Sequence, residues 1–498
     1  MRSPPATRRY QGLGLSQTLW IASTGELGLW KFTETLFAAL YGVSWITSVR
    51  RTKFGSQNRG FMTLRRIRAA AAVVTVATVV AGCARGGESD AAAADSEGLK
   101  TDVGVTSEPC PEAVDESKGC IYLGVISDLT VGPFASFGSA VTESNSAFWG
   151  RVNADGGIGD FEVDVTSFVK DNEYNPEVHR RAYREIEGEV LALAQTLGSP
   201  TTAAILEDMN ADSVLGVPAG WTSGWAFQDS ILVAGANYCY DAMNTVDWMV
   251  EEKGNQSVLS VGYPGDFGAD AAYGASVAAK AHGLEFSSIS TTPGPENQTA
   301  AITQIVESSP DVVIVTMGSS DMATIVGESV ARGYDGQFVG HSLTWNPGLM
   351  KSPAIGALEE HFLGSSMWGP WNAETAGHDA MRKALNAKQP SDGYVAGWVL
   401  QYPLKAALEA AVKNGDLTRK GLVDAARSLT TVDYEGMLPD GAGNFAGGPD
   451  ERMFRESVMQ AVDLQAPTGM SQVRDFYLGS TAKSFELKEP CYTLDPVK

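Results

Sequence analysis

Apolar and polar positions alternate along the chain in a way that predicts repeated strand–helix units. Short apolar runs with β-type alternation are followed by segments with helical spacing and then by glycine-rich turns. The strands are expected at 120–127, 161–170, 190–198, 231–236, 257–264, 284–291, 310–318 and 336–341, and the helices at 138–155, 176–188, 199–210, 269–282, 299–308 and 322–332. Pro176 suits a first helical position and Ser199 a helix cap. Units of this length predict two series of parallel strands with helices on both faces.

The loops that follow the strands are the expected place for function. In open parallel sheets, ligands bind outside the carboxyl ends of the strands. The loops that meet this condition are 128–138, 197–202, 217–225, 264–268, 317–321 and 340–346.

Residues 62–82 have the pattern of an export signal. Arg65, Arg66 and Arg68 form a basic start, and an apolar core of signal-peptide length follows them. The last residues, Val-Ala-Gly before Cys83, resemble the bacterial lipobox, in which the chain is cut before the cysteine and its thiol receives a diacylglycerol. The alternative is a plain signal peptide that happens to contain a cysteine. The lipobox predicts a protein held by its lipid on the outer face of the cell membrane.

The sequences of the segments on either side of this signal do not predict a folded domain. Residues 83–119 begin as a small, acidic, Gly/Ala/Ser-rich stretch and are predicted to be a flexible tether. Residues 1–61 contain an apolar stretch, 36–49, that is too short to span a membrane. Because signal peptides begin near the start codon, we interpret Met62 as the true start and residues 1–61 as a misassigned or disordered extension.

Composition and charge are those of a globular, acidic body. The chain has 498 residues, 44% of them apolar, which suffices for two or three domains. The first 82 residues hold 11 Lys and Arg against 2 Asp and Glu, and the remainder holds 26 basic against 57 acidic residues. Such a body repels nucleic acid and anionic lipid, so neither is an expected partner.

The cysteines agree with export. If Cys83 carries lipid, four remain, and four cysteines allow three pairings. We favour Cys110 with Cys120, which are close in sequence just ahead of the first core strand, and Cys239 with Cys491. The chain has no Cys-x-x-Cys and no His-x-x-x-His spacing, so neither a metal nor another cofactor is expected.

Several motifs together resemble one family. "DLTVGPFASFG" (128–138) resembles a Leu-Thr/Ser-Gly-Pro opening loop, and 152–177 resembles an Asn-x-x-Gly-Gly-Ile turn followed by a strand and a Pro-initiated helix. "YPGDFGAD" (263–270) resembles the loop that opens a second lobe, and 392–411 a late helix that returns to the first. In this order they resemble the Leu/Ile/Val-type solute-binding proteins of ABC importers, over about 120–460.

The resemblance implies a type I periplasmic-binding-protein fold: two doubly wound parallel-sheet lobes joined by a hinge of several crossings. Lobe one is expected at 120–238, completed by 368–435, and lobe two at 239–367, completed by 436–498. On this layout Cys239 and Cys491 both fall in lobe two. The two lobes would close on a small solute without reacting with it.

The implied function is that of a lipid-anchored, monomeric solute receptor for an ABC permease. The solute would be amino-acid-like, an amide or a carboxylate. A tethered sensor that presents its ligand to a signalling partner is an alternative with the same fold.

The family resemblance also implies ligand-binding residues. Ser199 and Thr201 match a loop that offers hydroxyl and amide groups to a carboxylate, although Ser199 as a plain helix cap is the alternative. Gly220, Trp221 and Thr222 match the next binding loop, with simple core packing as the alternative for Trp221. Phe267 matches an aromatic lid from lobe two, and Tyr394, on the late helix, is a weaker candidate.

Ser342 lies in the loop "GHSLTW", where the family's amino-acid binders carry an acidic residue that pairs with the ligand's ammonium. This loop has no carboxylate, and a buried ammonium without a counter-charge is costly. Either Asp321 or Asp266 therefore supplies the charge from a neighbouring loop, or the ligand lacks a free amine. The nearby tryptophans favour an apolar or aromatic solute.

The same loop resembles the Gly-x-Ser-x-Gly elbow of serine hydrolases, which makes Ser342 a candidate nucleophile. Thr344 stands where the second glycine is needed, and only His361 and His378 follow in the chain as candidate bases. The spacing leaves little room for the acid loop of such a triad. We therefore expect a binding protein with no catalytic residues.

Overall fold

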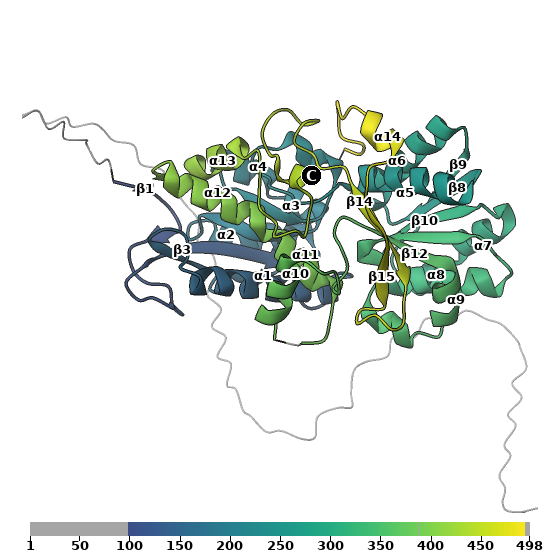
Figure 1. The fold of residues 1–498 in the computed structure, drawn as a ribbon, viewed down its shortest axis with the longest axis horizontal. Coiled ribbons are helices and arrows are strands. Elements are labelled where there is room, and N and C mark those ends of the chain that lie inside the picture. The colour runs from purple at the N-terminus through teal and green to yellow at the C-terminus, as the bar shows by residue number, and fades with distance from the viewer. Residues whose placement is uncertain (1–97, 387, 494–498) are drawn as a thin grey trace, which may run out of the picture. The chain divides into compact units, whose positions relative to one another are not determined.

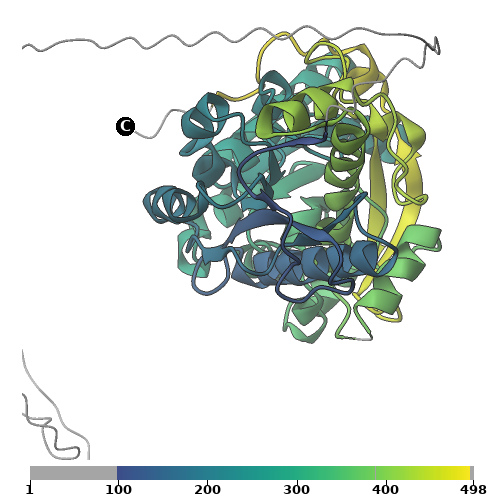
Figure 2. The same cartoon turned by 90° about the vertical axis from the view of Figure 1, so that its left-hand side faces the viewer.

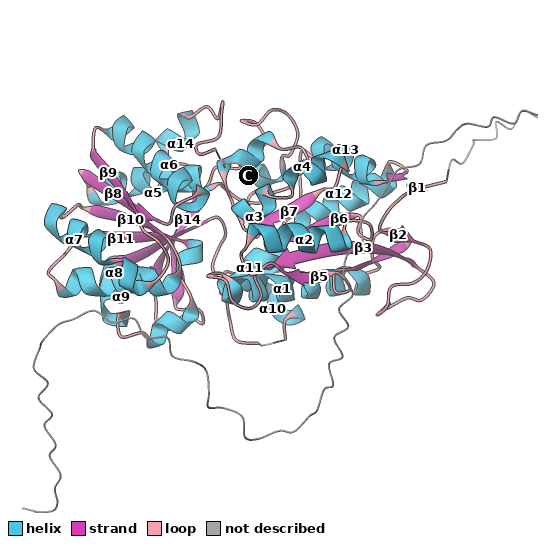
Figure 3. Cartoon of the chain, turned by 180° about the vertical axis from the view of Figure 1, so that it is seen from behind, coloured by secondary structure: helices cyan, strands magenta, loops and turns pink. Residues whose placement is uncertain are grey.

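The computed structural model describes residues 98–386 and 388–493, within one compact unit, Ala91–Lys498 (Figure 1). Two large sheets organise most of these residues, each with its own flanking helices (Figure 3). The export signal and Cys83 lie outside the described residues.

The first sheet has the order β2-β3-β6-β7, with β4 and β5 also paired to β3. Its strands are β2 Val105–Thr106, β3 Gly119–Ser127, β4 Phe161–Asp164, β5 Val169–Asp171, β6 Ala192–Leu197 and β7 Gly216–Ala219. The pairs are parallel except β2–β3. Helices lie on both sides of these strands (Figure 2): α1 Ala135–Ala154, α2 Pro176–Ile186, α3 Ser199–Ala203 and α4 Leu206–Ala211. The chain reaches this sheet again through α10 Ala376–Ala384, α11 Asp392–Val399, α12 Gln401–Lys413 and α13 Arg419–Ser428, with α11 packed on α1.

The second sheet has seven strands in the order β15-β14-β12-β11-β10-β8-β9. They are β8 Ser257–Gly262, β9 Glu285–Ser290, β10 Val312–Thr316, β11 Gln337–His341, β12 Phe362–Ser366, β14 Ser457–Val462 and β15 Met470–Tyr477. Strands β8 to β12 are parallel, while β14 and β15 are antiparallel. The helices are α5 Tyr238–Lys253, α6 Asp266–His282, α7 Thr299–Ser308, α8 Ser319–Ala331, α9 Ile355–His361 and α14 Ser480–Ser484.

The chain crosses between the two sheets several times. It leaves the first after β7, returns to it after β12 and leaves it again after α13 (Figure 1). The predicted two-lobed α/β architecture with a hinge of several crossings is therefore present. The exact lobe boundaries stay a prediction.

Three predicted elements differ from those observed. The strand predicted at 161–170 is broken into β4 and β5, because the Asp164 carboxylate accepts hydrogen bonds from the backbone N–H of Thr166 at 2.7 Å and of Ser167 at 3.2 Å and so closes a turn. The helix predicted at 199–210 is two short helices, α3 and α4. The strand predicted at 231–236 is only an isolated bridge between Ile231 and Gly216, at the outer edge of β7.

The predicted tether is wrong for its second half. Residues 98–119 lie on the first lobe, where β1 Lys100–Thr101 pairs with β13 Asp416–Leu417 and β2 pairs with β3. A disulfide between Cys110 and Cys120 closes this segment onto the start of β3. Backbone pairing and a covalent link order it in spite of its polar sequence.

The second predicted disulfide, Cys239–Cys491, is also present. It joins the first turn of α5 to the C-terminal segment. In the part of the chain that the structure describes, the helices are too short or too polar to cross a membrane.

The two disulfides close loops of very different length, with sequence separations of 10 and 252 residues. The chain-entropy model therefore assigns about 3 kcal/mol to the short loop and about 5 kcal/mol to the long one. We expect Cys239→Ala with Cys491→Ala to lower the melting temperature more than the control pair Cys110→Ala with Cys120→Ala. Thermal unfolding by circular dichroism measures this, and a larger loss in the control pair would contradict it.

Candidate functional site

A small cavity of about 20 Å³ lies between the carboxyl ends of the two sets of strands, with walls from both lobes. Its volume is close to that needed for one water molecule. Its lining is mainly aromatic and aliphatic: Phe134, Phe137, Tyr174, Leu197, Gly198, Ser199, Ala219, Gly220, Tyr238, Asp266, Phe267 and Leu343.

Two carboxylates fix the loop that carries Phe134 and Phe137. Asp128, at the end of β3, accepts hydrogen bonds from the backbone N–H of Gly132 at 3.0 Å and of Phe134 at 2.9 Å. Asp171, at the end of β5, accepts from the N–H of Leu129 at 3.0 Å. Because both anchors lie at strand ends, the loop presents its phenylalanines at the sheet edge where the cavity forms.

Tyr174 reaches the cavity from a turn in an uncommon backbone conformation. Its φ is 52° and that of Glu173 is 51°, both in the left-handed region. Buried Asn172 holds the turn: its Oδ1 accepts from the N–H of Tyr174 at 2.7 Å and its Nδ2 donates to the carbonyl of Leu197 at 2.9 Å. Such a conformation costs of order 1–3 kcal/mol per residue and clusters at functional sites.

Gly198 and Gly220 allow Tyr174 and Ser199 to pack closely against the backbone at the cavity wall. Gly198 has a φ of 93°, and a Cβ there would lie 2.7 Å from the ring of Tyr174. A Cβ on Gly220 would lie 2.8 Å from the hydroxyl oxygen of Ser199. A side chain at Gly198 or Gly220 would fill this space. The absence of one lets the backbone there and the Ser199 hydroxyl lie at the cavity wall.

Lobe two contributes the first turn of α6 to the cavity. The ring of Phe267 lies 6.5 Å from that of Phe134 in lobe one and 4.8 Å from that of Tyr238, measured between centroids. Phe134 in turn lies 4.9 Å from Tyr174. These contacts join the rings into a continuous aromatic wall that spans the two lobes.

Asp266 is the one carboxylate among the lining residues. It is 5% exposed, and its Oδ2 has no hydrogen-bond partner in the described structure. Burial raises the pKa of Asp266 to about 6, while the nearby Ser199 hydroxyl and the backbone amides at the start of α6 work against that rise. The cavity therefore holds an under-satisfied acidic group among aromatic rings.

A second buried carboxylate, Asp270, lies one helical turn further along α6 and links the lobes. It accepts hydrogen bonds from the backbone N–H and from the hydroxyl of Ser223, at 2.5 and 2.7 Å. The Ser223 hydroxyl also accepts from the N–H of Cys491 at 2.7 Å. Burial raises the pKa of Asp270 to about 7. Both oxygens of the buried Asp270 carboxylate therefore accept hydrogen bonds from protein groups.

Three of the residues expected from the sequence line the cavity: Ser199, Gly220 and Phe267. Ser199 is the first residue of α3, whose cap is Gly198, so its prediction as a helix cap is wrong. The side chain of Ser342 lies outside the described residues, but its neighbour Leu343 lines the cavity.

The other four expected residues are engaged elsewhere. The Thr201 hydroxyl donates to the carbonyls of Leu197 and Gly198, and the Trp221 indole donates to the carbonyl of Ala234 at 2.8 Å. Trp221 is fully buried and packs on Trp368, which is the core-packing alternative. Thr222 accepts from the N–H of Gly224 at 3.4 Å and begins a 3-10 turn.

Tyr394 also lies away from the cavity wall. Its hydroxyl donates to Glu143 at 2.7 Å, and its ring lies 5.9 Å from that of Trp371.

Between the two acidic residues proposed as counter-charges, the geometry favours Asp266. Asp321 accepts from the hydroxyl of Tyr263 at 2.7 Å and from the N–H of Gly294 at 2.8 Å, and it does not line the cavity. Its hydrogen bonds give it a structural role in lobe two.

The hydrolase alternative gains no support from the histidines that follow Ser342. His361 contacts the carbonyl of Gly336 through Nδ1 at 3.2 Å, and His378 contacts the hydroxyl of Thr375 at 2.8 Å. Neither lines the cavity. The strand β11 is followed by a 3-10 turn, Ser342–Thr344, rather than by the helix that an elbow requires.

The cavity also contains residues that the sequence reasoning did not single out. Phe134 and Phe137 lie in the predicted loop 128–138, so an inspection of its aromatic residues would have found them. No local sequence pattern indicated Tyr174 or Tyr238 as cavity residues. The position of Tyr174 depends on a left-handed turn, and that of Tyr238 on the path of the chain between the lobes.

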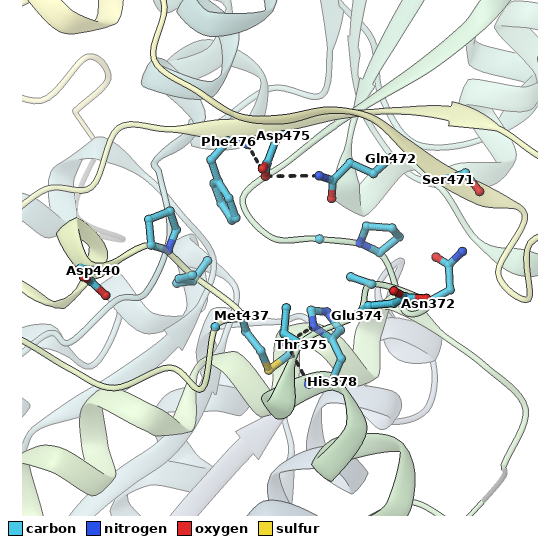
Figure 4. Close-up of a pocket in the computed structure, with 16 residues that line it drawn as sticks. Asn372, Glu374, Thr375, His378, Met437, Asp440, Ser471, Gln472, Asp475 and Phe476 are labelled. Carbon is cyan, nitrogen blue, oxygen red and sulfur yellow. Dashed lines mark hydrogen bonds between the residues drawn. The ribbon is translucent and has the colours of Figure 1, made fainter.

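A larger hollow of about 730 Å³ is an open groove on another part of the molecule (Figure 4). It is lined by Thr375 and His378 of α10, by the 436–440 segment and by β15 residues such as Gln472 and Asp475. The Asp475 carboxylate accepts from Gln472 at 3.3 Å and from the N–H of Phe476 at 2.8 Å. This groove lies along the crossing segments rather than at the parallel strand ends, where ligands bind in open sheets.

The comparisons with known proteins agree with this geometry. A family model described as "Periplasmic binding protein" matches residues 120–467. The structure is similar to a fatty acid ABC transporter substrate-binding protein from Thermomonospora curvata, with 26% identity and a TM-score of 0.70, covering 78% of this chain and 97% of that one. No curated protein sequence matches the chain.

Two further solved structures share the fold at lower identity. A branched chain amino acid ABC transporter protein from Thermus thermophilus with bound valine has 15% identity and a TM-score of 0.65, covering 74% of this chain and 98% of that one. A leucine-binding protein from Thermotoga maritima has 15% identity and a TM-score of 0.59, covering 72% and 97%. The type I periplasmic-binding fold expected from the sequence is thereby confirmed.

The contact between Ser223 and Asp270 predicts a measurable change in lobe closure. Ser223→Ala removes one hydrogen bond from a buried carboxylate, which costs the closed form about 1–3 kcal/mol. We expect a larger radius of gyration in small-angle X-ray scattering. The control is Ser230→Ala, which removes an equally buried serine bonded to Asn210 within lobe one. Identical scattering from both variants would contradict a closure role for Ser223.

Proposed function

Because this chain belongs to the periplasmic binding protein family, we propose that it is an extracytoplasmic solute receptor that delivers its ligand to an ABC permease. The observation that carries this proposal is the cavity with walls from both lobes, together with the hydrogen bonds by which Ser223 and Asp270 join the lobes. A ligand held between two lobes stabilises the closed form, which is the form a permease can distinguish from the empty receptor.

The ligand is a small solute with an apolar part. The cavity wall consists largely of phenylalanine, tyrosine and leucine side chains, and its polar side-chain groups are the hydroxyls of Ser199 and the two tyrosines and the carboxylate of Asp266. The protein from Thermomonospora curvata is named for fatty acid transport, and at 26% identity it supports an apolar solute rather than a small polar one. Amino-acid-like solutes, amides and carboxylates, fatty acids among them, are the classes to screen.

The protein acts outside the cytoplasm and is held there by lipid on Cys83. The support for this part is the basic, apolar and small-residue pattern of residues 62–83, which lies outside the described residues. The folded body begins by about residue 98, so the chain after Cys83 is long enough to keep the body clear of the membrane surface.

A thermal-shift screen of the purified protein against amino acids, amides and carboxylates tests the receptor function. A solute that binds only the native form raises its stability by about 2.7 kcal/mol when present at a hundred times its Kd. We expect at least one class to raise the melting temperature. If no class does so, and scattering shows no closure with any of them, the receptor function is wrong.

Cys83→Ala is expected to release the protein from the membrane. Without the thiol no diacylglycerol is attached, and the described body offers no helix able to span the bilayer. Cell fractionation followed by immunoblotting measures the distribution. Cys110→Ala is the matched control, since it removes a cysteine without touching the proposed anchor, and it should stay in the membrane fraction. Membrane retention of the Cys83 variant would contradict the anchor.

A further inference from the structure

We propose that residues 478–493 form a strap that ties the two lobes together, and that a dithiol loosens lobe closure by reducing the disulfide that holds the end of this strap. The inference rests on the proposed function, because it concerns the regulation of closure in the same receptor. Its starting point is that Cys491 is attached to both lobes. Its sulfur is bonded to Cys239 of lobe two, and its backbone N–H donates to the hydroxyl of Ser223 of lobe one at 2.7 Å.

The first part of the strap is fixed to lobe two, where α14 lies against α5 (Figure 1). The buried carboxylate of Asp247 on α5 accepts hydrogen bonds from the N–H and the hydroxyl of Thr481, both at 2.7 Å. Asn244 accepts from the N–H of Gly479 at 2.9 Å. Asp247 also contacts Nε2 of His282, at the end of α6, at 2.6 Å. The strap therefore begins as a part of lobe two that is bonded to α5.

The middle of the strap is held as firmly as its start. Arg455 donates to the carbonyls of Ala482 and Phe485 at 2.9 and 2.8 Å, and the N–H of Leu487 donates to Asp450 at 2.6 Å. The side chain of Leu487 is buried. These bonds do not involve the disulfide, so they keep the strap in place as far as residue 487.

The end of the strap depends on the disulfide. Among the described residues 489–493, Cys491 supplies the only cross-link and the only hydrogen bond to other segments. Because the S–S bond fixes the Cys491 backbone beside α5, it also fixes the position of the N–H that reaches Ser223. Opening the disulfide leaves this short end to move about the anchored residue 487.

The hydroxyl of Ser223 passes this attachment on to α6. It accepts the hydrogen bond from Cys491 and donates its own proton to Asp270 at 2.7 Å. A hydroxyl has a single proton, so a donor on its oxygen leaves that proton for the carboxylate. Ser223 and Asp270 are both fully buried. Two groups of lobe two, Cys491 and Asp270, therefore bind the same serine of lobe one.

Loss of the Cys491 contact weakens closure for this reason. The buried hydroxyl of Ser223 then lacks the donor that orients it, and a buried polar group without its partner is unfavourable. Its hydrogen bond to Asp270 is no longer held in one direction. Since Asp270 lies one helical turn from Asp266, which lines the cavity, the disulfide influences the interlobe site without contacting a solute.

A reductant can reach this disulfide from the side of Cys491. Cys491 is partly exposed, whereas Cys239 is fully buried. Cys110 and Cys120 of the other disulfide are 7% and 0% exposed. Because thiol–disulfide exchange requires access to a sulfur atom, Cys491 is the atom attacked, and its disulfide is reduced before the other one.

The exchange itself transfers two electrons from the dithiol to the protein. One thiolate of the dithiol attacks the sulfur of Cys491, the S–S bond breaks, and Cys239 leaves as a thiolate that takes up a proton. The second thiolate of the dithiol then displaces Cys491 from the mixed disulfide. The products are two protein thiols and the disulfide form of the reductant.

Dithiothreitol on the unaltered, folded protein tests the inference. Alkylation followed by mass spectrometry reports which disulfide has been reduced. We expect reduction of Cys239–Cys491 to speed hydrogen exchange at the N–H of Ser223 about 10-fold, as for the loss of one hydrogen bond to a charged group. We also expect a larger radius of gyration in small-angle X-ray scattering without any solute. Circular dichroism confirms that the protein stays folded.

Three variants show whether the effect runs through the strap. Cys110→Ser with Cys120→Ser keeps the strap disulfide and should respond to dithiothreitol as the unaltered protein does. Cys239→Ser with Cys491→Ser should have the larger radius of gyration from the start and should not respond. In Ser223→Ala, reduction should add little to the radius of gyration, because residues that act through one contact have non-additive effects.

The outcomes separate this inference from the proposed function. Reduction of Cys239–Cys491 that changes neither the exchange at Ser223 nor the radius of gyration overturns the inference, as does an equal response in Ser223→Ala. Faster exchange across the whole chain, or resistance of this disulfide to dithiothreitol in the folded protein, also overturns it. The receptor function depends on the solute screen with the oxidised protein and stands in each of these cases.

Discussion

The structure depends on the burial of two carboxylates where the first turns of α6 meet the opposite lobe. Asp266 and Asp270 lie one turn apart on this helix, and both are buried. A buried carboxylate needs hydrogen bonds or a positive partner. Ser223 provides this for Asp270 across the boundary, whereas one oxygen of Asp266 is left to the cavity. The contact between Ser223 and Asp270 therefore ties the start of α6 to the first lobe, one helical turn from the residue that lines the cavity.

The remainder of the site is held by groups that never touch the cavity. Asp128 and Asp171 fix the loop that presents Phe134, and Asn172 holds the left-handed turn that presents Tyr174. These anchors stand at the carboxyl ends of β3 and β5, where the strand hydrogen bonds stop and side chains take over the unpaired backbone groups. The strain in the turn is consistent with a residue placed for binding rather than for folding.

Much of the fold could be predicted from the sequence, because a strand such as 120–127 is buried almost throughout and so reads as an apolar run, whereas a helix such as 176–188 buries one face and so shows helical periodicity. The break in 161–170 was missed because it depends on one side chain, Asp164, closing a turn. In the site, the family resemblance predicts Phe267 and Ser199 as cavity residues. It leaves Asp266 and Asp321 as two alternatives for an acidic residue. The position of Tyr238 in the cavity wall could not be predicted, because it depends on how the two lobes meet. No local sequence pattern encodes that arrangement.

A co-crystal structure with a solute that raises the melting temperature of the protein tests the central claim most directly. The account predicts closed lobes with the solute between them, in contact with Phe134 of lobe one and Phe267 of lobe two. A structure with the solute bound outside the interlobe cavity would contradict the account.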